Sequence, residues 1–280
     1  MPLGSAPRGS ASAGGRSGEP DLSTMNTPKP SPYDAPELYD VLFDPLDFDV
    51  PYWLDVARQA GGPLLEAGCG TGRILLRLIA AGADAEGFDA SAPMIERLRV
   101  KARSAGRPVQ AVVADMRDFS LPRRYARVIC AFNGFAHCET TADQIRALER
   151  FREHLAPGGA AVIHMSYPGP KYWAEPEGAP VFETETRDPA SGHTLQLWDT
   201  RFKDPVAQFQ RSEVEIREIE EGGRIVASHR FSTSQRWVYR FELELLFRAA
   251  GFVRWEISGG FDQKPLTSPE DQMIAWAWRD

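Results

Sequence analysis

The sequence predicts an α/β protein with a doubly wound, mostly parallel, seven-stranded sheet and an inserted antiparallel sheet. Between residues 63 and 167, short apolar runs alternate with amphipathic helical runs, which indicates buried parallel strands with helices on both faces. From 168 to 238 the apolar period shortens to about two, which favours an antiparallel insertion. Helical periodicity returns at 239–280, so we expect 33–167 and 239–280 to form one domain.

The chain begins with a segment of different composition. Pro, Gly, Ser and Ala supply 20 of residues 1–32, so too little apolar surface is available to offset the entropy of ordering, and we expect disorder. No apolar stretch of the signal-peptide type is present there. Residues 33–57 contain seven Asp or Glu and no Lys or Arg, and their apolar spacing predicts two short helices.

The elements of the main domain follow in order. Ser91 and Pro93 are typical of a helix start, and Pro157-Gly158-Gly159 of a helix stop. Strands are expected at 63–66, up to Asp89, 109–114, 127–132, 160–166, 252–258 and 273–278, and helices at 73–81, 94–105, 143–155 and 241–250. Strands of the insertion are expected at 181–187, 194–202, 209–219 and 224–237, separated by turn-forming residues.

Composition excludes several classes of protein. The net charge is −7, from 32 basic and 39 acidic side chains, which argues against binding nucleic acid. No apolar run reaches the roughly 18 residues of a membrane span. Three cysteines without CxxC spacing predict neither a disulfide framework nor a zinc site, so we expect no metal and a reducing cytoplasm.

Three glycines mark a ligand-binding loop. Gly68, Gly70 and Gly72 lie between a strand and a helix, where backbone without Cβ permits close approach of a ligand to free helical N–H groups. The dinucleotide fingerprint G-x-G-x-x-G requires a third glycine at the position of Arg73, so this loop departs from it.

The G-x-G-x-G spacing, preceded by Glu66, resembles motif I of class I S-adenosylmethionine methyltransferases. Four further signals of that family follow in order across residues 63–166: Asp89, Asp115-Met116, Phe132-Asn133-Gly134 and the turn at 154–159. The resemblance implies a Rossmann-like fold, S-adenosyl-L-methionine as cofactor and S-adenosyl-L-homocysteine as product. It is loose over the insertion.

The resemblance also implies cofactor contacts. Asp89 would accept the ribose hydroxyls, Asp115 the adenine amine, and Met116 would pack against the ring. Tyr39, in a "YD" pair typical of small-molecule members, would close over the methionine end; the alternative is a helix residue that packs on the domain. The full expected set is Tyr39, Glu66, Gly68, Cys69, Gly70, Gly72, Asp89, Ala90, Met94, Asp115, Met116, Phe132 and Asn133.

His137 is the candidate general base. It follows the fourth strand at the carboxyl edge of the sheet, its ordinary pKa suits proton transfer near neutrality, and a histidine lies in the corresponding loop of the sugar-amine N-methyltransferases that this chain resembles. The alternative is an exposed or capping histidine. His154 and His164 are expected to be structural, the latter inside a buried strand.

The acceptor is expected to be a small organic molecule. Aromatic residues of the insertion favour a ring or a cation, although core packing is the alternative for each; we expect Tyr33, Trp173, Trp198 and Trp237 to contact it. Nitrogen is the preferred acceptor atom, then oxygen, then carbon. Rival hypotheses are an NAD-type oxidoreductase and a non-catalytic cofactor-binding module, and either a monomer or a homodimer fits.

Overall fold

A computed structural model describes residues 30–280, so the disorder expected for 1–29 lies outside the described residues. Residues 30–32, which composition assigned to the disordered segment, are ordered. The carbonyl of Pro30 accepts a hydrogen bond from the backbone of Ser232, and Ser31 caps a 3-10 helix, η2 (Pro32–Asp34). Tertiary contacts with a distant segment therefore fix residues whose composition alone indicates disorder.

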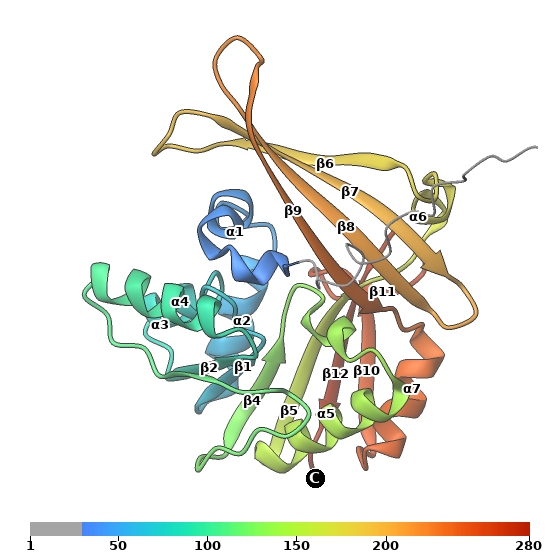
Figure 1. The fold of residues 1–280 in the computed structure, drawn as a ribbon. Coiled ribbons are helices and arrows are strands. Elements are labelled where there is room, and N and C mark those ends of the chain that lie inside the picture. The colour runs from blue at the N-terminus through green and yellow to red at the C-terminus, as the bar shows by residue number, and fades with distance from the viewer. Residues whose placement is uncertain (1–29) are drawn as a thin grey trace, which may run out of the picture.

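The central sheet holds eight strands in the order β11-β10-β12-β5-β4-β1-β2-β3 (Figure 1). Parallel pairing joins β1 to β2 and β4, β2 to β3, and β4 to β5, whereas β12 pairs antiparallel with β5 and β10. The bounds are Leu64–Ala67 (β1), Ala85–Asp89 (β2), Ala111–Val113 (β3), Tyr125–Cys130 (β4), Leu155–Ser166 (β5), Arg254–Gly259 (β10), Lys264–Pro265 (β11) and Gln272–Trp278 (β12).

The sheet confirms the predicted doubly wound α/β class, with one addition. The eighth strand, β11, has two residues and pairs with the end of β10, and a run this short has no detectable periodicity. The Pro157-Gly158-Gly159 turn interrupts the pairing of β5 with β4, with Gly158 at φ +73°.

Helices cover both faces of the sheet. The core on one face includes side chains of α2 (Val50–Ala60), α3 (Leu75–Ala80) and α4 (Ala92–Ser104). The core on the other includes α5 (Thr141–His154) and α7 (Arg240–Ala249). As predicted, Ser91 caps α4 by accepting from the backbone N–H of Met94. None of the helices within 30–280 is long and apolar enough to cross a membrane.

The insertion forms a separate antiparallel sheet in the order β6-β7-β8-β9, which we call the lid sheet (Figure 1). It comprises β6 (Pro180–Arg187), β7 (Thr194–Asp204), β8 (Phe209–Ile219) and β9 (Ile225–Arg236), and a short helix not predicted from sequence, α6 (Pro170–Ala174), precedes it. Its apolar face packs on α1 (Pro36–Phe43) through Leu195, Ile216 and Phe231 around Leu42. The leading helix α1 thereby supports one end of the lid sheet.

Candidate functional site

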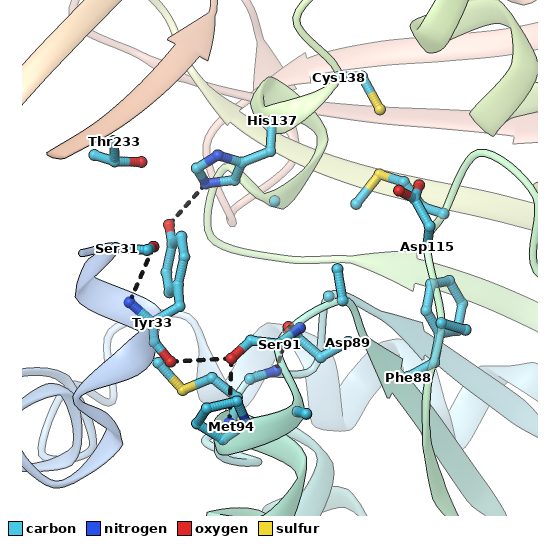
Figure 2. A pocket seen from close by; sticks show the side chains of 18 of the residues that line it. Ser31, Tyr33, Phe88, Asp89, Ser91, Met94, Asp115, His137, Cys138 and Thr233 are labelled. Atoms are coloured by element: carbon cyan, nitrogen blue, oxygen red, sulfur yellow. Dashed lines mark hydrogen bonds between the residues drawn. The ribbon is translucent and has the colours of Figure 1, made fainter. Parts of the chain in front are cut away.

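A cavity of about 600 Å³ lies at the carboxyl ends of β1, β2 and β4 (Figure 2). Its volume falls within the range of small-molecule sites, and its place at the strand ends is where doubly wound folds bind ligands. The glycine loop (68–72), the described residues before β1 (30–63, the leading segment), η3 (Gly134–His137) and β9 surround it. Of the residues singled out in the sequence, Tyr33, Tyr39, Gly68, Gly70, Asp89, Ala90, Met94, Asp115, Met116, Phe132 and His137 line it.

The glycines of the loop divide into two kinds. Gly68 and Gly70 line the cavity at φ +70° and +54°, and no Cβ contact closer than 3.9 Å would form at either position. Gly72 lies behind the cavity at φ +88°, where a Cβ would come within 2.9 Å of Leu98 Cδ1. Cys69 is also behind the cavity, buried against Gly87. Two of the loop residues expected at the cofactor thus serve the packing of the loop.

We predict that Gly72→Ala destabilises the fold. The added methyl group meets the Leu98 side chain, and the left-handed backbone disfavours any residue with a Cβ. The expected cost is about 1–3 kcal/mol in the free energy of unfolding, measured by denaturant titration. Gly106→Ala, also left-handed but with no heavy atom within 4 Å of the added carbon, is the control for backbone strain alone. Equal losses for both variants would contradict the role of close packing.

Asp89 joins the glycine loop to the start of α4. One carboxylate oxygen accepts from the backbone N–H of Gly70 and the other from that of Ser91, both at 2.8 Å. Burial raises the pKa of Asp89, while these two N–H groups lower it. Each carboxylate oxygen retains a lone pair, so the side chain can still accept from vicinal hydroxyls in the cavity.

Asp115 and Arg117 form a local ion pair at the cavity wall. Arg117 donates to both carboxylate oxygens, at 2.9 and 2.5 Å, and these hydrogen bonds hold the pKa of Asp115 below its usual value. Asp115 is therefore an ionised acceptor with one side chain already bound to it. Met116 and Phe88 supply an apolar surface next to it.

Tyr33 and His137 form a hydrogen-bonded pair at one side of the cavity, shown by the dashed line in Figure 2. The tyrosine oxygen lies 2.7 Å from Nε2, and the other ring nitrogen, Nδ1, lies 3.1 Å from the carbonyl of Ser234 on β9. A carbonyl only accepts, so Nδ1 carries the proton and Nε2 accepts from Tyr33. Burial lowers the pKa of His137 and raises that of Tyr33, which keeps the pair neutral.

Glu66 lies beneath the glycine loop and is 4% exposed. Burial raises its pKa to about 8, and Oε2 has no hydrogen-bond partner among the described residues. Glu66 does not line the cavity, but a buried polar atom without a partner is costly, so this oxygen is suited to accept a hydrogen bond. The open backbone at Gly68 and Gly70, the free acceptor positions of Asp89 and the unpaired oxygen of Glu66 all fit the amino-acid nucleoside that the sequence motifs imply.

Tyr39 lines the cavity and also packs inside the leading segment. Its ring lies 6.1 Å from Tyr33 and 4.7 Å from Phe43. These contacts fit the packing interpretation, and the role of Tyr39 as a lid over the methionine end stays a prediction.

The three tryptophans expected at the acceptor do not line this cavity, and their contact with an acceptor stays a prediction. Trp198 packs against Phe182 and under Arg217, on the face of β7 opposite Leu195. Trp173 on α6 packs against Trp237, which lines a separate cavity of about 160 Å³ that also includes Asn133. The period of two shows that a strand has two faces but does not say which face meets the site.

The lid sheet reaches the cavity through other residues. Ser232, Thr233 and Ser234 of β9 line it, together with Ser31, Asp34, Ser91, Arg117, Cys138 and Glu139. None of these β9 residues carries a sequence signal, because their place depends on the register between the lid sheet and the main domain. No group of three or more metal-ligating side chains is found within residues 30–280.

Comparison with known proteins gives concordant results. Residues 64–159 match the family model described as a methyltransferase domain. A dTDP-3-amino-3,6-dideoxy-alpha-D-glucopyranose N,N-dimethyltransferase of Streptomyces fradiae is 30% identical over 200 residues, covering 70% of this chain and 72% of that protein. A cypemycin N-terminal methyltransferase of a Streptomyces species is 28% identical over 88% of this chain and 96% of its own length.

The fold comparison agrees with the sequence comparison. The CcbJ methyltransferase from Streptomyces caelestis superposes with a TM-score of 0.70 at 25% identity, covering 89% of this chain and 98% of that chain. The match therefore extends over most of this chain and nearly all of the other.

Proposed function

Because this chain belongs to the S-adenosylmethionine-dependent methyltransferases, we propose that it methylates an amine nitrogen on a small organic acceptor. The observation that carries this proposal is the neutral Tyr33–His137 pair in a cavity whose charged lining is mostly acidic. Asp34, Asp89 and Glu139 line it, and its guanidinium, Arg117, is paired with Asp115. One relative described above is named as the N,N-dimethyltransferase of an amino sugar nucleotide, and another as the N-terminal methyltransferase of cypemycin.

We propose cofactor contacts for five residues of the expected set. Asp89 would hold the ribose, Asp115 and Met116 the adenine, Glu66 the amino group at the methionine end, and Tyr39 would cover that end. S-adenosylmethionine supplies a methyl group that is already activated on sulfur. The protein then has to align the acceptor, exclude water and accept the one proton that the acceptor releases.

The Tyr33–His137 pair is the candidate proton acceptor. An amine attacks only in its neutral form, and the proton it carries has to leave. The lone pair of His137 Nε2 is held by the Tyr33 hydroxyl, so we propose that the hydroxyl accepts the acceptor proton while passing its own to Nε2. The Ser234 carbonyl on β9 fixes the required ring tautomer.

We predict that His137→Ala lowers turnover far more than cofactor affinity. General-base assistance contributes about 10²–10⁴-fold, and the deficit should shrink above the pKa of the amine, where solvent supplies neutral acceptor. The measurement is kcat against pH, together with calorimetry of S-adenosylhomocysteine. His229→Ala, which removes a lid histidine bound to Glu218, is the control. Unchanged turnover across the pH range would remove His137 from the mechanism.

A direct test of the proposed function uses binding and turnover in parallel. We expect S-adenosylmethionine and S-adenosylhomocysteine to bind in calorimetry and NAD to give no heat. Methyl transfer is then followed on matched pairs of amino and hydroxyl compounds, including an amino-sugar nucleotide and a peptide N-terminus. Heat only from NAD would restore the oxidoreductase hypothesis, and binding without any methyl transfer would favour a non-catalytic module.

We further propose a monomer or homodimer that works in a reducing cytoplasm without nucleic acid or membrane partners. All three cysteines, Cys69, Cys130 and Cys138, are free and buried, which supports a reducing compartment. Light scattering of the purified protein decides between the two oligomeric states.

A further inference from the structure

The loop after β4 contains an unusual backbone conformation. Phe132 and Asn133 have φ of +50° and +63°, the one consecutive pair of non-glycine residues with positive φ in the described part of the chain. Asn tolerates this left-handed region, whereas a bulky residue such as Phe is a true outlier there. Such strain persists only where surrounding structure enforces it, and it concentrates at functional sites.

The enforcing contacts come from the last residues of β5. The backbone N–H of Phe132 donates to His164 Nδ1 at 3.2 Å, and that of Asn133 donates to the His164 carbonyl at 3.3 Å. The side chain of Asn133 closes a second pair of bonds, in which Ser166 N donates to Oδ1 at 2.6 Å and Nδ2 donates to Ser166 Oγ at 3.1 Å. Phe132 is thus held through its backbone N–H, and Asn133 through both its backbone and its side chain.

Gln272 on β12 completes the arrangement. Because Nδ1 of His164 accepts from Phe132, its proton is on Nε2, which donates to Gln272 Oε1 at 2.8 Å. The same oxygen receives the Ser166 hydroxyl at 3.4 Å. The antiparallel register pairs Gln272 with Ser166 and Ile274 with His164, so these polar side chains share one face of neighbouring strands. His164 is 2% exposed, and burial lowers its pKa, which supports the neutral form.

The Phe132–Asn133 turn connects a wall of the cavity to the helix that carries His137. The Phe132 ring lines the cavity, with the Arg73 guanidinium 4.9 Å from its centre. Immediately after Asn133, η3 begins and carries His137 to Tyr33. A change in the backbone at 132–133 therefore moves a wall of the cavity and the candidate base together.

We propose that His164, Ser166 and Gln272 form a clamp that holds the Phe132–Asn133 turn in its strained conformation and so positions the Phe132 ring and His137. The clamp residues act through the turn and are positioning residues. The inference rests on the proposed function for its consequence in methyl transfer, but the clamp itself concerns only contacts within the chain.

The matched comparison is between two buried histidines. His154 also accepts a backbone N–H on one ring nitrogen, from Leu121 at 3.0 Å, and pairs with a carbonyl, that of Arg150, through the other. It is 4% exposed and does not line the cavity. His164→Leu and His154→Leu therefore remove the same kind of bond, but only the first releases the turn.

Hydrogen exchange of the full-length protein without ligand tests the clamp directly. We expect the amides of Phe132 and Asn133 to exchange faster in His164→Leu and to remain as in the wild type in His154→Leu. His164→Asn, whose Oδ1 can replace Nδ1 as acceptor, should restore the protection. If His164→Leu does not fold, Gln272→Leu, which removes the acceptor of the Nε2 proton at a half-buried position, should show the same local change.

Ligand binding and kinetics supply the second readout. We expect His164→Leu to weaken S-adenosylhomocysteine binding by about tenfold and to lower kcat/KM by about 100-fold, because a displacement near 1 Å costs about that much in alignment. His154→Leu should change neither. Equal effects of both substitutions, or unchanged exchange at 132–133 in His164→Leu, would overturn the clamp. Failure of the wild type to bind the ligand would instead defeat the proposed function.

Discussion

Asp89→Asn is expected to weaken S-adenosylhomocysteine binding by about 100-fold or more. The carboxylate accepts from two backbone N–H groups, one on the glycine loop and one at the start of α4. An amide of the same shape turns one of these acceptors into a donor that faces an N–H donor, and hydrogen bonds to charged groups contribute about 1.5–3 kcal/mol each. The substitution therefore disturbs both the glycine loop and the start of α4, and it removes a charged acceptor for the ribose hydroxyls.

The measurement is calorimetric titration of the folded variant, with circular dichroism to establish that it is folded. Asp84→Asn is the matched control, because the exposed Asp84 directly precedes the same strand at its other end and pairs with Arg123. We expect the control to bind as the wild type does. Equal affinity in Asp89→Asn and the wild type would show that Asp89 does not hold the cofactor.

Sequence reasoning predicts those parts of the fold and site that depend on local pattern. The order of strands and helices, the α4 cap at Ser91 and the cavity-lining positions of Asp89, Asp115 and His137 all follow from residues at or near the ends of predicted strands. Parallel strands place their carboxyl ends at one edge, so a motif after each strand is enough to bring these groups together.

What sequence reasoning misses depends on contacts between distant segments. Trp198 faces away from the cavity because of the orientation of the lid sheet, which no local period encodes. The partner of His137 is Tyr33, 104 positions earlier, and the clamp joins His164 to Gln272, 108 positions later. His164 was expected to be a structural residue of a buried strand, and its bond to a strained turn becomes visible only in three dimensions.

Arg73 also has a structural role that the sequence motif did not indicate. In the sequence it marked the departure from the dinucleotide fingerprint. In the structure its guanidinium makes a bidentate ion pair with Asp49, at 2.6 and 2.7 Å, and donates to the carbonyl of Leu46. Asp49 is fully buried, Arg73 is 7% exposed, and Trp53 donates to the same carboxylate. Through this pair, Arg73 at the end of the glycine loop binds Asp49 and Leu46 of the leading segment.

Arg73→Met is expected to lower the free energy of unfolding by about 3–5 kcal/mol at pH 7. Removal of one partner leaves a buried carboxylate without its counter-charge, which costs far more than loss of an exposed pair. Arg58→Met, which breaks the exposed pair with Asp55 in α2, should cost about 1 kcal/mol or less. The double variant Arg73→Met/Asp49→Leu should recover much of the loss, because no unpaired charge remains.

The pH dependence of unfolding separates this explanation from simple loss of packing. Burial by itself raises the pKa of Asp49, but the hydrogen bonds and charge of Arg73 outweigh it and hold that pKa below its usual value. In the wild type, the contribution of the pair is therefore present above about pH 4, near the pKa of Asp in an unfolded chain, and is lost as the pH falls through the folded value.

In Arg73→Met the sign reverses. A buried Asp49 without its partner has a pKa above that of the unfolded chain, so folding favours the protonated acid and the variant gains stability, relative to wild type, as the pH falls from 7 toward 4. Denaturant titrations of both proteins across that range measure the difference. A gap between them that stays constant with pH would show that Asp49 is not left as an unpaired charge, and the loss would then be one of packing against Phe132.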